Sequence, residues 1–359
     1  MKSEKQVKVK ELLNYPLQNL STSLYIDFSN PVNCIVLSKD NKTVVVSGMN
    51  FICKIQIAPF RVLKYVEINC DIWKITFSSS EMYLFLASNE TDNSIFMHNA
   101  ENLNYIRTIH GHTNFVSEII VLKKLPFLVS SSSDKKIIFY NAFDFSIAHT
   151  VTSKDQWFRT LLVNKEETLL YGGGENNYIV IFDLNDFSEK KSKKMIEGIF
   201  SLTFGKNEEV LYVGMEKGLM FLNSLTLDVK RYFNVFQDWI WGLYSFYDDK
   251  FVIASSDDHC VKSISNMKTN QYTDLIRHSD RVFDVKITAE GYLLTASQDE
   301  TFGILKTRVV LPKLTINDAE IRKLIRLKSN KFLQMKVRHI IEQLKTMDHC
   351  EKQYAGILI

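Results

Sequence analysis

The sequence predicts an all-β fold, a seven-bladed β-propeller, because one short apolar pattern recurs along most of its 359 residues. The pattern returns at intervals of 40, 44, 42, 41, 41 and 42 residues. Its first position is occupied by Val32, Ile72, Val116, Phe158, Ile199, Ile240 and Val282. The residue three positions later is always apolar, and the residue five positions later is apolar in six repeats. A period of about 40–45 residues built from short strands is typical of a propeller, in which each repeat buries its sheet against its neighbours.

A second recurring position lies 17 to 20 residues after the first and predicts a tight turn in every repeat. It is occupied by Asn50, Asp92, Asp134, Asn176, Glu216, Asp258 and Asp299. All but Glu216 are short polar residues that favour turns. Apolar residues follow at alternate positions, a spacing that fits a half-buried strand and excludes a helix.

Two segments resemble WD40 repeats. One runs from Gly111-His112 to Ser130-Ser-Ser-Ser-Asp134 and Tyr140, and the other runs from His278 to Thr295 and Asp299. The resemblance covers roughly residues 22–310 and implies a buried tetrad of His, Ser or Thr, Asp and Trp in each typical repeat. Two repeats keep most of it: His112, Ser130 and Asp134 with Tyr140 in place of Trp, and His278, Thr295 and Asp299 with Leu305 in place of Trp.

The repeats divide the chain into three parts: an N-terminal extension (1–21), the propeller (22–312) and a C-terminal tail (313–359). The last repeat needs an outer strand to close the ring, because an uncovered sheet edge promotes aggregation. By analogy with WD40 closure we expect the segment 24–28 to supply this strand, with the segment 308–311 as the alternative.

The tail has helical spacing and is predicted to form an α-helical extension. Leu333, Val337, Ile340 and Leu344 step by 4, 3 and 4 residues and form a helix seam. We expect the seam to pack on its own propeller or to pair with a partner helix, and a contact with a membrane surface or nucleic acid remains an alternative.

Composition indicates a soluble globular protein, with 45% hydrophobic and 24% charged residues. No stretch is long and apolar enough to span a membrane, and the first residues lack an apolar signal region. The five cysteines are scattered and contain no Cys-x-x-Cys pair, which favours a reducing compartment. We therefore expect a cytoplasmic protein. The net charge of +3 is too small to indicate nucleic-acid binding.

No pattern of catalytic, cofactor-binding or metal-ligating residues emerges. The glycine cluster at 172–174 lacks the spacing of a phosphate-binding loop. His110 and His112 could suggest a metal, but no further ligand stands at a standard spacing, so a structural role for His112 is favoured. Asp257-Asp258-His259 has no accompanying nucleophile motif.

The residues that flank the first recurring position are the candidate binding residues, and they include all four tryptophans of the chain. They are Trp73, Phe115, Trp157, Arg159, Phe200, Trp239, Trp241, Arg281 and Phe283. In the family that this chain resembles, such residues border the mouth of the central channel, where partners dock. Exposed Trp, Phe and Arg side chains there would form a binding hot spot. For Trp157 and Trp239, packing between blades is an equal alternative.

These observations predict a non-enzymatic scaffold for protein interactions, or a structural subunit of a multiprotein complex. An RNA-associated scaffold and a propeller enzyme are the alternatives. The first would require basic residues clustered on one rim, and the second would require acids or histidines converging in the channel.

Overall fold

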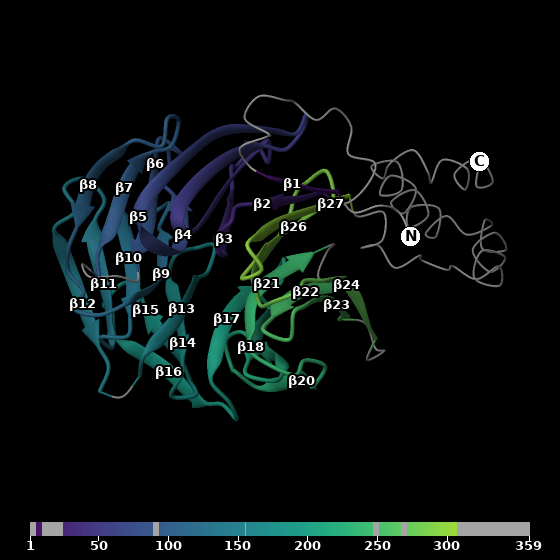
Figure 1. Cartoon of the computed structure of the whole chain (residues 1–359). Helices are drawn as coiled ribbons and strands as arrows, with labels where there is room; N and C mark the ends of the chain where they lie inside the picture. The colour runs from purple at the N-terminus through teal and green to yellow at the C-terminus, as the bar shows by residue number, and fades with distance from the viewer. Residues whose placement is uncertain are drawn as a thin grey trace, which may run out of the picture. The chain divides into compact units, whose positions relative to one another are not determined.

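The computed structural model describes residues 5–8, 24–88, 93–154, 156–246, 251–266 and 271–306. In these ranges the chain is all β and forms a β-propeller of 27 strands in six hydrogen-bonded sheets. Figure 1 shows β3, β9, β13, β17 and β21 around the middle of the ring, with β8, β12, β16 and β20 at its circumference. None of the described residues forms a helix that could cross a membrane.

Four sheets have four antiparallel strands each, and each sheet is one repeat of the sequence. The third repeat comprises β9 (Val116–Val121), β10 (Phe127–Ser132), β11 (Lys136–Asn141) and β12 (Ile147–Thr152). The fourth comprises β13 (Phe158–Val163), β14 (Leu169–Gly174), β15 (Tyr178–Asp183) and β16 (Glu189–Lys194). The fifth comprises β17 (Ile199–Phe204), β18 (Val210–Met215), β19 (Leu219–Asn223) and β20 (Val229–Phe233). The sixth comprises β21 (Ile240–Phe246), β22 (Phe251–Ser256), β23 (Cys260–Ser265) and β24 (Tyr272–Arg277).

The first two repeats share one six-stranded sheet. It consists of β3 (Val32–Leu37), β4 (Thr43–Gln56), β5 (Arg61–Phe77), β6 (Tyr83–Ser88), β7 (Ile95–Asn99) and β8 (Tyr105–Ile109). Ile72, where the second repeat begins, lies inside the 17-residue strand β5. The prediction of seven blades was therefore wrong: the described residues form six sheets, because backbone pairing continues through β5 from the first repeat into the second.

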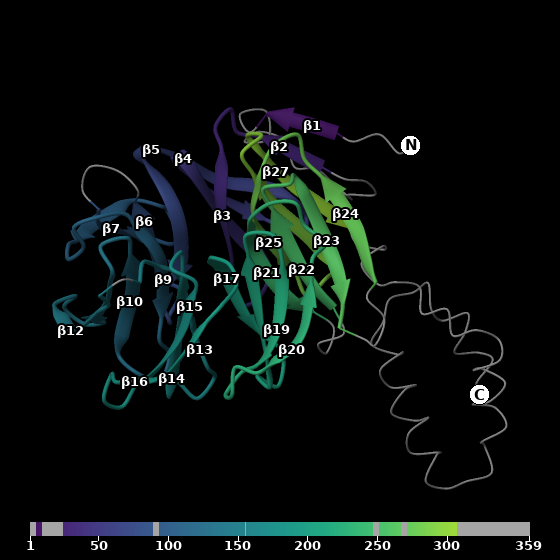
Figure 2. The ribbon, with the colours of Figure 1, turned by 90° about the horizontal axis from the view of Figure 1, so that it is seen from below.

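The last sheet closes the ring with a strand from the other end of the propeller. It contains β25 (Val282–Ile287), β26 (Tyr292–Ser297) and β27 (Thr301–Lys306), with β2 (Leu24–Asp27) antiparallel to β27 and β1 (Lys5–Lys8) parallel to β2. Figure 2 shows β2 beside β27, with β1 next to β2. Closure by the segment around residues 24–27 is thus confirmed. The alternative segment, 308–311, lies outside the described residues.

The first recurring position has the expected structure in every repeat, but the second does not. Asn50 lies inside strand β4 instead of in a turn, and Asp92 lies outside the described residues. All seven residues of the first position are at most 1% exposed, and six of them begin a strand. At the second position, Asp134, Asp258 and Asp299 each accept a hydrogen bond from the backbone N–H two residues later. The residue between has a positive φ, as at Lys135 (67°). The aspartate thereby replaces a backbone acceptor in the tight turn.

The two expected tetrads appear as buried hydrogen-bonded triads. His112 contacts Asp134 through Nδ1 at 2.9 Å and Ser130 through Nε2 at 2.7 Å. Tyr140 is fully buried in the same repeat.

His278 makes the equivalent contacts with Asp299 and Thr295, both at 2.9 Å. Leu305 occupies the Trp position without a polar group, but the Thr301 hydroxyl donates to Asp299 at 2.6 Å.

Three glutamates connect neighbouring repeats at the turns that follow the inner strands, and the sequence did not indicate this. Glu167 accepts hydrogen bonds from the backbone N–H groups of residues 123, 124 and 125, at 2.5, 2.7 and 2.9 Å. Glu81 accepts one from Lys39 at 2.6 Å, and Glu208 accepts one from Lys165 at 2.8 Å. All three glutamates have positive φ angles of 55–59°. We call them the glutamate clasps.

The seam residues Leu333, Val337, Ile340 and Leu344 lie outside the described residues, as does the rest of the predicted tail. Their packing on the propeller or on a partner stays a prediction.

Deleting residues 1–30 should give an aggregating or unfolded protein. The deletion exposes the edge of β27 and removes Leu24 and Ile26, which are at most 1% exposed and pack with Phe302 and Ile304. Burial of each such side chain contributes about 1.5–3 kcal/mol. Size-exclusion chromatography and thermal melting would test this, with deletion of residues 1–4 as the control. A soluble, monodisperse deletion with unchanged melting would contradict closure by β2.

Replacing Asp299 with Ala should lower the free energy of unfolding by about 1–3 kcal/mol, since it leaves buried donors without an acceptor. Burial alone would raise the pKa of Asp299, but hydrogen bonds from His278 and Thr301 hold it below the ordinary value. The folded state therefore favours the ionised carboxylate, and its contribution is lost as the pH falls through the acid range. Chemical denaturation at neutral and acidic pH, with Asp144→Ala in an exposed turn as control, measures this. An equal loss of unfolding free energy in both variants would contradict a stabilising role for the triad.

Candidate functional site

Every inner strand carries a β-bulge immediately after its first recurring residue. The extra residues are Asn33, Trp73, Ser117, Arg159, Phe200, Trp241 and Phe283. A bulge bends the strand and redirects the extra side chain. Six of the bulges lie where an inner strand begins, and the seventh lies at the corresponding point inside β5. All seven therefore act on the same end of the ring, which we call the channel mouth.

The aromatic bulge residues meet one another across the ring. Trp73 contacts Trp241 with ring centroids 5.6 Å apart, and it contacts Phe283 at 5.3 Å. Phe200 contacts Trp241 at 5.2 Å. The second and sixth repeats are not neighbours, so the contact between Trp73 and Trp241 spans the middle of the ring. Phe200, Trp241 and Phe283 are only 5%, 8% and 6% exposed.

The residues that precede the recurring position form an outer layer over this contact. Trp239 stacks on Phe200 with centroids 4.6 Å apart and planes inclined by 16°. Phe115 contacts Trp73 edge-on at 5.8 Å. Trp157 and Trp239 are half-buried, whereas 54% of the Arg281 side chain is exposed. We call the seven rings together the aromatic plug: Trp73, Phe115, Trp157, Phe200, Trp239, Trp241 and Phe283.

The guanidinium group of Arg159 is a largely buried cation inside the plug. Its guanidinium carbon lies 4.6 Å from the Trp157 ring and 5.4 Å from the Trp241 ring. The rings of Phe115 and Phe200 follow at 5.7 and 5.9 Å. Burial lowers the pKa of Arg159, while its hydrogen bond to Glu175, at 2.9 Å, opposes that shift. Aromatic faces and one carboxylate thus replace the water that a guanidinium would otherwise need.

Two donors in this group have no acceptor among the described residues. They are the Nε of Arg159 and the indole Nε1 of Trp157, and both atoms are buried.

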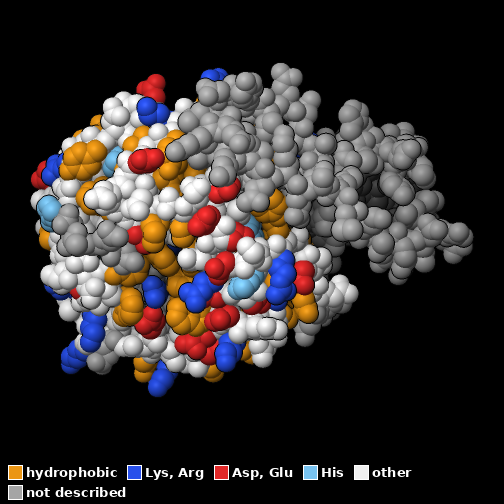
Figure 3. Space-filling view, viewed as in Figure 1, with side chains coloured by type: hydrophobic (Ala, Val, Ile, Leu, Met, Phe, Trp, Pro, Cys, Tyr) orange, Lys and Arg blue, Asp and Glu red, His pale blue; other side chains and the backbone are white. Residues whose placement is uncertain are grey.

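Asp257 connects the plug to its charged rim. It accepts a hydrogen bond from the Trp241 indole at 2.6 Å and lies 3.6 Å from the Nε of Arg281. Burial raises the pKa of Asp257 to about 6, although the bond from Trp241 and the charge of Arg281 lower it. The face shown in Figure 3 has hydrophobic and charged side chains intermixed across the middle of the ring.

Deeper in the channel lies a network of charged side chains. The Nζ of Lys286 is 2.7 Å from Asp284, and the Nζ of Lys74 is 3.6 Å from Glu118. Asp284 also accepts a hydrogen bond from the backbone N–H of Ile35 at 2.9 Å. Burial opposes ionisation of Asp284, but Lys286 and Lys74 hold its pKa below the ordinary value. This network joins the seventh repeat to the first.

Comparison with known proteins agrees with this geometry. Residues 103–141 match the family model for the WD domain, G-beta repeat, and this segment contains the triad of His112, Ser130 and Asp134. The chain thus contains a WD40 repeat within a β-propeller. No curated protein matches the chain.

The structure of this propeller brings all nine candidate binding residues to the channel mouth. The expected exposure was wrong for Phe200, Trp241 and Phe283, because the bulges turn these rings inward and they bury one another. It was also wrong for Arg159, whose side chain is only 11% exposed because it packs among the rings and pairs with Glu175. Trp73, Phe115, Trp157 and Trp239 are half-buried, and Arg281 is exposed. A binding role for these residues stays a prediction.

The candidate metal ligands lie in different environments. His112 bonds within its triad, and His110 contacts the Ser94 hydroxyl through Nδ1 at 2.9 Å. The described residues of the propeller contain no group of three side chains that could hold a metal ion. The glycine cluster forms the end of β14. A Cβ on Gly172 would come within 2.8 Å of Phe158, so the glycines permit close packing of inner strands.

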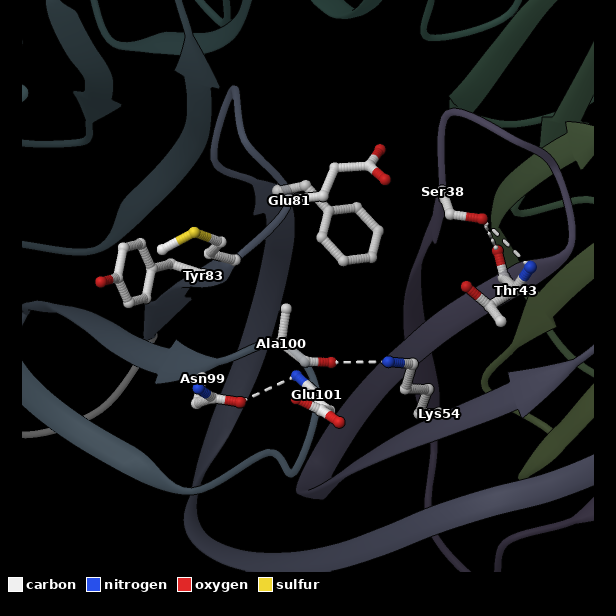
Figure 4. Close-up of a pocket in the computed structure, with 10 residues that line it drawn as sticks. Ser38, Thr43, Lys54, Glu81, Tyr83, Asn99, Ala100 and Glu101 are labelled. Carbon is white, nitrogen blue, oxygen red and sulfur yellow. Dashed lines mark hydrogen bonds between the residues drawn. The ribbon is translucent and has the colours of Figure 1, made fainter.

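One pocket of about 440 Å³ lies between turns of the first two repeats, at the end opposite the channel mouth. Figure 4 shows its polar groups in contact with one another. Lys54 donates to the carbonyl of Ala100 at 2.8 Å, and Asn99 accepts from the backbone of Glu101 at 2.9 Å. Since these groups already serve the fold, we assign no ligand to this pocket.

Tryptophan fluorescence of the wild type should titrate with a midpoint near pH 6, because Asp257 has a pKa of about 6 and accepts the Trp241 indole bond. The change should be absent in Asp257→Asn. The pKa lies above the ordinary aspartate value, so burying the ionised group opposes folding above pH 6 and this cost declines on acidification. The variant should therefore gain stability mainly above pH 6. An unchanged fluorescence titration in Asp257→Asn would contradict this assignment.

Proposed function

We propose that this protein is a non-enzymatic scaffold, or a structural subunit of a multiprotein complex, that binds protein partners at the channel mouth. The observation that supports this most directly is the accessible part of the aromatic plug, where Trp73, Phe115, Trp157 and Trp239 are half-buried. Propellers of the WD40 family typically act as protein-interaction scaffolds. A cytoplasmic location and a contribution of the C-terminal tail to assembly belong to the same proposal.

The energetics of the plug support protein binding. Its inner rings hold the outer rings in place, so a partner gains aromatic contact area without having to order mobile side chains. Trp and Arg are enriched among residues that dominate binding free energy, particularly at the centre of an interface. Trp239 and Arg281 combine these residue types with partial exposure at the mouth.

An RNA-associated scaffold is less well supported. RNA binding at this site would need accessible cations beside the aromatic rings. Arg159 is largely buried and paired with Glu175, and Arg281 faces the carboxylate of Asp257. The rim of the plug therefore offers few free positive charges to a phosphate backbone.

The double variant Trp239→Ala, Arg281→Ala should lose its main protein partner while keeping its fold. Both side chains are partly exposed, whereas Trp241 is buried and bonded to Asp257, which makes Trp241 a poor choice for this test. Capture from cell extract with quantitative mass spectrometry would compare wild type and variant, and circular dichroism and thermal melting would verify folding.

The matched control is Phe143→Ala, since Phe143 is 84% exposed in a turn at the opposite end of the ring. It removes an exposed aromatic ring without touching the mouth, so it should retain the partner. Capture of the same partner by a folded mouth variant at wild-type level would show that the channel mouth is not the docking surface.

A further inference from the structure

Acidic side chains surround the mouth along the fourth to seventh repeats. In these repeats, the two residues before each inner strand and the two after each second strand include eight acids and two bases. The acids are Glu175, Glu197, Glu216, Asp238, Asp257, Asp258, Asp280 and Asp299, and the bases are Lys217 and Arg281. The excess of carboxylates makes this half of the mouth negative.

Four of these carboxylates have partners within the protein. Glu175 pairs with Arg159 at 2.9 Å, Asp258 with Lys262 at 3.1 Å, and Asp299 with His278 at 2.9 Å. Asp257 faces Arg281 at 3.6 Å. The other four, Glu197, Glu216, Asp238 and Asp280, form no ion pair with another described residue.

Asp238 and Asp280 each directly precede a residue of the channel mouth. Asp238 directly precedes Trp239 and accepts a hydrogen bond from its backbone N–H at 2.9 Å. Asp280 makes the corresponding contact with the backbone of Arg281 at 2.8 Å. The negative charges of both residues act on Asp257. Asp238 therefore supplies a carboxylate without an ion-pair partner among the described residues, next to Trp239 in the sequence.

Arg159 shows what these groups can bind. Four aromatic rings and one carboxylate hold its guanidinium inside the plug. The outer layer offers a similar combination, since Trp239 is half-buried and the neighbouring Asp238 forms no ion pair with a described residue. A cation over an aromatic ring beside a carboxylate is stabilised both by the ring and by the opposite charge.

Building on the protein-binding function proposed above, we propose that the partner docks through a basic segment. The segment places an arginine or lysine against Trp239, between Asp238 and Asp280, with apolar neighbours on the remaining plug rings. Negative charge at the mouth attracts such a segment from a distance and repels acidic peptides and nucleic acids. Association is therefore sensitive to salt.

The test uses the full chain and two synthetic decapeptides. In the first peptide, arginine alternates with leucine and glycine. In the second, glutamate takes the place of arginine. All four tryptophans lie in the plug, so intrinsic fluorescence reports on this site. We expect saturable binding of the arginine peptide that weakens with salt, and no binding of the glutamate peptide. Neutralising two carboxylates that would pair with the basic segment should weaken binding roughly three- to thirtyfold in Asp238→Asn, Asp280→Asn.

The control variant Glu101→Gln, Glu189→Gln removes the same charge from exposed positions outside the mouth and should bind like the wild type. Equal losses of affinity in both variants would show that binding depends only on the net charge, and this would overturn the proposal. Preference for the glutamate peptide or for single-stranded RNA would also overturn it, as would no response to any probe. The partner-capture experiment with Trp239 and Arg281 decides separately whether the mouth is a docking surface.

Discussion

The fold depends on packing between successive repeats. A small sheet of four strands has two apolar faces, and neither is covered within its own repeat. The described residues form seven inter-repeat cores, each with side chains from two successive repeats. Ile199, for example, packs with Tyr171 of the preceding repeat and Leu211 of its own. Stability is therefore shared around the ring, and the six sheets act as one structure.

The bulges separate two tasks within each inner strand. The recurring residue faces the inter-repeat core, and the bulged residue after it faces the channel. Without the bulge, strand alternation would still place the two on opposite faces, but the channel-facing side chains would lie in a regular ladder. The bulges gather rings from distant repeats into the plug, which closes the middle of the ring and leaves only its outer layer accessible.

Sequence periodicity predicted the inner strands and most of the turns, and the resemblance to WD40 repeats implied the triads and the place of the candidate binding residues. Periodicity could not predict the burial of Trp241 and Phe283, because that depends on their contacts with Trp73 in a repeat that is adjacent to neither. The glutamate clasps were missed for a related reason. Glu167 binds backbone groups more than 40 residues earlier, and backbone donors leave no residue-type signal. The repeat pattern likewise does not indicate the continuous pairing through β5.

Because β2 closes the ring, folding cannot be completed until the last strand has been synthesised. Asp27 pairs with Thr301, so the first strand of the ring waits for the last strand to be translated. At roughly 5–20 residues per second this wait lasts on the order of 15–55 s. Throughout that time the growing chain holds two unpaired sheet edges, one at each end of an unfinished ring. A nascent chain that stalls anywhere before β27 cannot hide them, which makes it a natural substrate for chaperones.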